Sequence, residues 1–109
     1  MTRVMPMARE AAVVLGAQVA AARRRRGETA ASLADRAGIY PVTLRKVERG
    51  DPSVALGTAL DVACLAGVSL FGADTPARMG ELAENATARL ALLPARVTPV
   101  TDEGLDDDF

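Results

Sequence analysis

The sequence lacks histidine and tryptophan and contains a single cysteine, Cys64. One thiol cannot form a disulfide within the chain, and its place between Ala63 and Leu65 favours a small buried apolar side chain. Without histidine, most metal sites and most pairs of a nucleophile with a general base are excluded. We therefore expect no metal, no cofactor and no enzymatic activity.

Aromatic residues and long apolar runs are also scarce. Only 3% of the residues are aromatic although 50% are hydrophobic, and Ala, Val and Leu supply most of that half. Ala and Leu favour helices, whereas β-branched and aromatic residues favour strands. No uncharged run approaches the ~20 apolar residues that span a membrane, and no signal-peptide pattern follows Arg3. The composition predicts an all-α protein in the cytoplasm.

The net charge of −1 conceals two oppositely charged parts. Residues 1–72 carry ten basic and six acidic side chains, a net charge of +4, whereas residues 73–109 carry three basic and eight acidic ones, a net charge of −5. Such a division indicates one part that binds a polyanion and another that makes separate contacts. We therefore expect a domain at 1–72, a helix and arm at 73–100, and an acidic flexible tail at 101–109.

Helical periodicity, cap residues and helix breakers predict five helices. They are expected at 6–26, at 30–37 with Thr29 as the N-cap, at 41–49, at 54–66 with Ser53 as the N-cap, and from Asp74 or Thr75 to about Leu93. Residues 68–71 are expected to close the core as an apolar plug that includes Phe71. Residues 96–100 are expected to form an extended strand or arm.

The third predicted helix has two chemically different faces. Leu44 and Val47, three residues apart, form its inner face. Short helices are marginal alone, so they persist only in a bundle that leaves one of them free to project. A helix fits the major groove of DNA, and basic side chains bind phosphates and base edges. The outer face carries such side chains: Thr43, Arg45, Lys46 and Arg49.

Two sequence elements resemble the Cro/repressor (XRE-type) helix-turn-helix family. They are Leu-Ala-x-x-Ala-Gly-Ile at 33–39 and Thr-Leu-x-x-Val-Glu-Arg-Gly at 43–50. The resemblance covers roughly residues 15–71 and implies a five-helix repressor-like DNA-binding domain. It also implies palindromic half-sites, a recognition helix that starts near Tyr40, and a buried ion pair between Arg23 and Glu48.

The sequence departs from that family at the base-reading positions. Tyr40, Pro41 and Val42 stand where Gln or Ser is usual, and Ala30 replaces a common Gln, so bidentate readout of adenine is lost. Tyr40 either contacts phosphate or packs over the turn, and Arg45 and Lys46 either contact DNA or are simply solvated. The full set of candidate DNA-binding residues is Arg26, Thr29, Tyr40, Val42, Thr43, Arg45, Lys46 and Arg49.

The C-terminal third predicts an interaction surface. Met79, Leu82, Leu90 and Leu93 form an apolar stripe that either packs on the domain or makes a homodimer, and the length of the helix favours the dimer. The tail ends in Asp106, Asp107, Asp108 and Phe109, an acidic cluster with an aromatic anchor. In this layout the chain resembles HipB-type antitoxins, which implies a HipA-like kinase toxin as partner and autoregulation of the operon.

The sequence therefore predicts a dimeric transcriptional repressor that binds a double-stranded DNA operator and acts as the antitoxin of a toxin–antitoxin pair. Two alternatives stay open. One is a stand-alone regulator that responds to a small ligand. The other is a protein-interaction module that has lost DNA binding, suggested by the missing glutamines.

Overall fold

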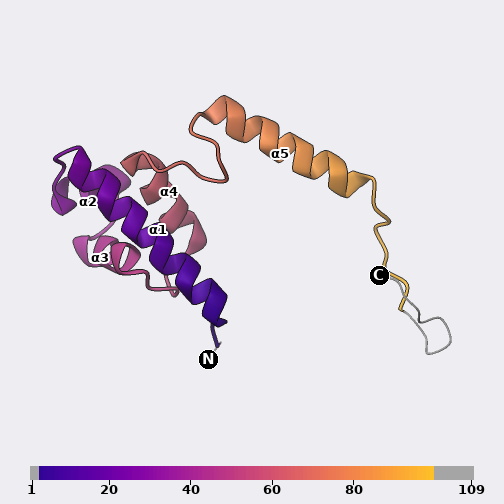
Figure 1. The fold of residues 1–109 in the computed structure, drawn as a ribbon, viewed down its shortest axis with the longest axis horizontal. Helices are drawn as coiled ribbons and strands as arrows, with labels where there is room; N and C mark the ends of the chain where they lie inside the picture. The colour runs from indigo at the N-terminus through magenta and orange to yellow at the C-terminus, as the bar shows by residue number, and fades with distance from the viewer. Residues whose placement is uncertain (1–2, 100–109) are drawn as a thin grey trace. The chain divides into compact units, whose positions relative to one another are not determined.

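The computed structural model describes residues 3–99, and these residues form five helices and no strand (Figure 1). The helices are α1 (Pro6–Arg25), α2 (Ala30–Ala37), α3 (Pro41–Arg49), α4 (Leu56–Ala66) and α5 (Pro76–Ala91). The chain divides into two compact units, Met1–Asp74 and Thr75–Phe109. Within the described range, no helix combines the length and the hydropathy needed to cross a membrane.

Local signals define the ends of α2 and α3. The hydroxyl of Thr29 accepts a hydrogen bond from the Ser32 N–H, which confirms Thr29 as the N-cap of α2. Gly38 and Gly50 follow α2 and α3 with φ values of 69° and 80°, in the left-handed region that favours glycine. Pro41 occupies the first turn of α3, where its missing N–H costs nothing.

The predicted starts and ends of two other helices need correction. Ser53 does not cap α4, because its N–H and hydroxyl both donate to the Asp51 carboxylate in a turn, and the helix begins only at Leu56. In the second unit, α5 is capped by Thr75 as expected but ends at Ala91 rather than Leu93. Pro94 disfavours a helical conformation at the residue before it, so the last turn is lost.

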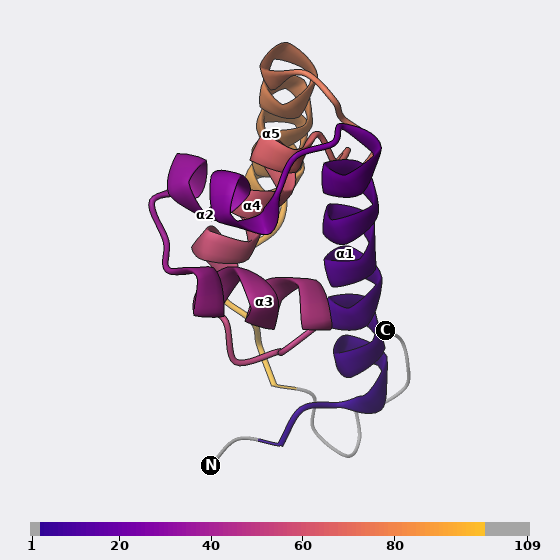
Figure 2. The ribbon, with the colours of Figure 1, turned by 90° about the vertical axis from the view of Figure 1, so that its left-hand side faces the viewer.

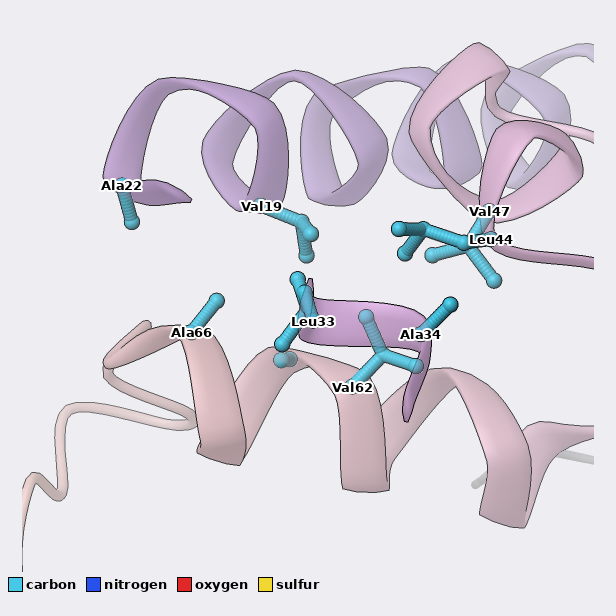
Figure 3. Packing of buried hydrophobic residues seen from close by; sticks show 9 residues of the cluster. Val19, Ala22, Leu33, Ala34, Leu44, Val47, Val62 and Ala66 are labelled. Atoms are coloured by element: carbon cyan, nitrogen blue, oxygen red, sulfur yellow. The ribbon is translucent and has the colours of Figure 1, made fainter. Parts of the chain in front are cut away.

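The core of the first unit lies between α1, α2, α3 and α4. Val19, Leu33, Leu44 and Val62 are its largest fully buried side chains, and they point toward one another from four different helices (Figure 3). Alanines fill the remaining space, which lets the helices approach closely. The buried alanines of this core cluster are Ala22, Ala34, Ala63 and Ala66.

Two residues expected in the core are exposed. Phe71 is 83% exposed and adopts a φ of 53°, because Leu70 and Ala73 are bridged to each other and Phe71 lies in the turn between them. Leu70, not Phe71, packs against the core. Cys64 is also exposed, since the inner face of α4 at this level is occupied by Ala63 and the side chain one residue later points about 100° away from it.

A close approach of α1 to the end of α3 fixes the position of α3. In Figure 2, α3 runs across α1, with its C-terminal end against that helix. A Cβ atom at Gly16 would lie 2.3 Å from the carbonyl oxygen of Val47, and one at Gly50 would lie 2.7 Å from the Val13 Cα. Both positions therefore exclude any side chain.

Replacing Gly16 by Ala should destabilise the first unit by about 1–3 kcal/mol, because the new methyl group must displace backbone rather than a flexible side chain. Thermal unfolding followed by circular dichroism measures the change. Gly57→Ala in α4 is the matched control, since its Cβ meets open space and should be neutral or slightly stabilising. Equal melting temperatures for the two variants would contradict the close approach.

Charged side chains also tie the helix ends together. Glu28 accepts two hydrogen bonds from Arg36, each 2.8 Å long, and one from the Ser32 hydroxyl. These bonds lower the pKa of Glu28 to about 2. Arg36 and Arg26 also donate to the carbonyl oxygen of Leu65 in the last turn of α4, where positive charge complements the helix dipole.

The Glu28 contacts predict a specific loss of stability in acid. Because its folded-state pKa lies below the ordinary value, the carboxylate contributes stability above about pH 4.5 that disappears as the pH falls through about 2. We expect the melting temperature of Glu28→Gln to fall less than that of the unmodified protein between these pH values. Parallel curves of melting temperature against pH would contradict the assignment.

Candidate nucleic-acid interface

The outward face of α3 is a continuous stripe of exposed side chains. The stripe follows the i, i+3, i+4, i+7 spacing of one helix face, opposite the buried Leu44 and Val47. We call it the α3 stripe, and its members are Val42, Arg45, Lys46 and Arg49. Thr43 is half-buried at its edge. Three of the four members of the α3 stripe are cationic.

The cations of the α3 stripe differ from other arginines of this unit in their contacts. Arg23, Arg26 and Arg36 each donate hydrogen bonds to groups of the domain itself. No hydrogen bond or ion pair within residues 3–99 engages the side chains of the three cations of the stripe. Their hydrogen-bond donors are therefore directed to solvent or to a ligand.

One carboxylate lies close to the stripe. The pKa of Asp51 is lowered chiefly by hydrogen bonds from the Ser53 hydroxyl and N–H, and further by the nearby charges of Lys46 and Arg49. Because Ser53 occupies one of its oxygens and the two cations outnumber it, Asp51 leaves the face positively charged.

Tyr40 stands at the start of α3 and does not pack over the turn. It is the N-cap residue, its side chain makes no capping hydrogen bond, and it is 78% exposed. Pro41 has no N–H, and the N–H groups of Thr43 and Leu44 bond to the Tyr40 carbonyl oxygen. The exposed Tyr40 side chain at the start of α3 is therefore available for contact with a ligand, whereas most N–H groups of the first turn are not.

Arg26 and Thr29, the two candidates outside α3, have internal contacts. One nitrogen of Arg26 donates to the Leu65 carbonyl oxygen at 2.8 Å, and the Thr29 oxygen accepts from the Ser32 N–H at 3.1 Å. Both residues are nevertheless exposed. Their contact with DNA stays a prediction, with a structural role already established for each.

The ion pair between Arg23 and Glu48 is present and joins α1 to α3. The Arg23 Nε donates to Glu48 Oε2 at 2.7 Å and its Nη2 to Oε1 at 3.0 Å, while Nη1 donates to the Glu28 carbonyl oxygen. The two side chains are 11% and 14% exposed. The Glu48 hydrogen bond is the main reason that the pKa of Arg23 is raised. All three donor groups of the guanidinium are therefore used.

The sequence interpretation missed the residues that set the position of the stripe. Gly16 is a helix-interior glycine, and such a glycine is a known sign of close packing between helices. Gly50 ends α3 with a positive φ, and α1 also excludes a side chain there, which was not predicted from the sequence. The contact of Glu28 with Arg36 was not predicted, because the two residues are eight positions apart.

An apolar hollow of about 380 Å³ lies beside the stripe's helix, between the first half of α1, the turn after α3 and the start of α4. Ala8, Leu15, Val54 and Leu56 are among its lining residues. Asp51 is the one charged residue in the lining, and Ser53 already donates twice to its carboxylate. The hollow thus offers few polar groups that would orient a small ligand.

The second unit, taken by itself, presents the expected apolar residues of α5. Met79, Leu82, Leu90 and Leu93 are all at least partly exposed, and no residue of α5 is buried. Residues 94–99 form no strand. The tail residues Asp106, Asp107, Asp108 and Phe109 lie outside the described residues.

No known protein family, curated protein or solved structure matches this chain. Among residues 3–99, no group of three or more metal-ligating side chains comes together. The α3 stripe and Tyr40 present three cations with no partner among residues 3–99, an exposed hydroxyl and an apolar side chain, on a helix packed closely against α1.

Replacing Glu48 by Ala should destabilise the domain by about 3–5 kcal/mol, because the largely buried Arg23 guanidinium would lose its carboxylate partner and keep only the Glu28 carbonyl oxygen as an acceptor. A thermal melt measures this effect. The double variant Arg23→Met with Glu48→Leu should recover most of the loss, since it removes both charges. A melting temperature of Glu48→Ala within a couple of degrees of the unmodified protein would contradict this expectation.

Proposed function

We propose that the protein is a sequence-specific DNA-binding transcriptional repressor in which α2 and α3 form a helix-turn-helix and α3 is the recognition helix. The observation that carries the proposal is the α3 stripe, a row of exposed cations with no partner in the described part of the chain. A helix of this width enters the major groove, and its basic side chains bind phosphates and base edges.

The distribution of charge supports the same function. The acid within α3, Glu48, is neutralised by Arg23 on the side facing α1, so it does not oppose a polyanion at the stripe. The first 72 residues carry a net charge of +4. Such a field attracts DNA over a distance of about 10 Å at moderate salt and orients the domain before contact.

A dimer is part of the proposal, because one small domain covers only half of a palindromic site. The exposed apolar residues of α5 are the proposed dimer surface. The antitoxin role and the HipA-like kinase partner follow from the resemblance and from tail residues that lie outside the described range. They remain part of the proposal without support from a contact.

The two alternatives make different predictions from DNA binding. A ligand-responsive regulator requires a site with orienting polar groups, and the apolar hollow has few. A protein-interaction module without DNA binding requires no cationic groove-facing helix. A gel-shift experiment on the DNA upstream of the protein's own gene separates the interaction module, which should not bind, from the two DNA-binding functions. Thermal stabilisation of the protein by a metabolite would favour the ligand-responsive regulator.

Binding to duplex DNA should weaken steeply as salt rises between about 50 and 200 mM, with a slope of about −0.9 in log K against log salt for each phosphate neutralised. Fluorescence anisotropy of a labelled duplex measures the slope. Arg49→Ala, at the end of the stripe, should reduce its magnitude by about 0.9. Arg96→Ala in the second unit is the charge-matched control. Binding that is independent of the salt concentration would contradict the proposed function.

A further inference from the structure

The α3 stripe offers a restricted set of groups for reading bases. From Tyr40 to Arg49 the helix and its cap hold two arginines, one lysine and an exposed valine, but neither asparagine nor glutamine. Adenine is read in the major groove chiefly by the paired donor and acceptor of such an amide. If α3 enters that groove, it therefore lacks the main means of selecting adenine.

Guanine is the base that matches the groups present. Its N7 and O6 are two acceptors in one line, and an arginine guanidinium donates to both at once. Arg45 is exposed, no hydrogen bond or ion pair within residues 3–99 engages its side chain, and it is absent from the cations that lower the pKa of Asp51. Of the two guanidinium groups in the stripe, that of Arg45 is therefore the one less affected by a carboxylate.

Position along α3 separates the roles of the three cations. Base edges are contacted by residues nearer the N-terminal part of a recognition helix. Arg49 is the last residue of α3, so it is suited to a backbone phosphate. Lys46 lies beside Arg45 on the stripe and presents a single ammonium, which also bonds to guanine acceptors.

Val42 supplies the second element of recognition. It lies one turn before Arg45 and is exposed, so its methyl groups can contact the C5-methyl group of thymine. Three residues of helix rise by about 4.5 Å, and DNA base pairs are spaced by about 3.4 Å along each strand. Val42 and Arg45 therefore reach base pairs that are adjacent or separated by one.

We infer that the α3 stripe selects guanine through Arg45, assisted by Lys46, next to a thymine contacted by Val42. This inference rests on the proposed function, and it adds the class of sequence that the site takes. Each half-site then contains a guanine within two base pairs of a thymine.

The test starts with the full chain and a library of random duplexes, from which bound DNA is selected and sequenced. We expect one guanine to be fixed in each half-site. Replacing it by 7-deazaguanine, which removes N7, should weaken binding by roughly 5- to 150-fold. Replacing it by inosine, which keeps N7 and O6, should leave binding nearly unchanged.

A variant then links that guanine to one residue. Arg45→Gln should move the preferred base at this position from guanine to adenine, because a Gln amide matches the N6 and N7 of adenine. The substitution is at an exposed position, so the melting temperature should be retained. Arg24→Ala removes an exposed arginine outside α3 and should leave base preference unchanged, whatever its effect on affinity.

The outcomes distinguish this inference from the function on which it rests. Salt-dependent binding without a selected guanine, or a guanine that Arg45→Gln still prefers, overturns the inference and leaves DNA binding intact. Absence of binding to every duplex at low salt overturns the repressor proposal, and the inference with it.

Discussion

The close contact between α1 and the end of α3 is the constraint on which the site depends. Gly16 lets the backbone of α1 approach the carbonyl oxygens of Val47 and Glu48, and the Arg23 fork then joins α1 to the Glu48 side chain. The close packing at Gly16 and the ion pair of Arg23 thus join the same two helices, and the two residues lie less than three turns apart in α1. A helix of nine residues is marginal by itself, so its orientation comes from these contacts.

Hydrogen bonds distinguish two groups among the arginines of the first unit, and the groups have different physical roles. Arg23, Arg26 and Arg36 are bound to carboxylates or carbonyl oxygens, where a planar guanidinium with five donors is well satisfied. Among residues 3–99, no acceptor binds the arginines of the α3 stripe, whose side chains are exposed. Composition alone cannot separate the two groups, because both are made of the same residue.

Most helix boundaries in this fold are local and were therefore predictable from the sequence. Thr29 and Gly38 act within a few residues of themselves, so their spacing is sufficient evidence. Ser53 was assigned wrongly because two turn-forming side chains compete there, and Asp51 takes the donors of Ser53. Phe71 was assigned to the core by hydrophobicity, although the backbone turn directs it outward. Gly16 lies inside a helix, which is a sign of close packing, but its contact partners Val47 and Glu48 lie in another helix, and no local pattern identifies them.

If DNA is read by cations, as proposed here, a fixed position of α3 matters more for specificity than it would if amide side chains read the bases. Arginine and lysine bind phosphates at any sequence, so their charge favours specific and non-specific sites alike. Discrimination arises only when the fork of Arg45 is held where N7 and O6 of one base are found, because a mobile helix would let it reach a phosphate instead. At Gly16 and Gly50 the backbones of α1 and α3 lie too close for a side chain, and such close packing opposes this movement. The packing of α1 on α3 is therefore the physical basis of the proposed specificity as well as of stability.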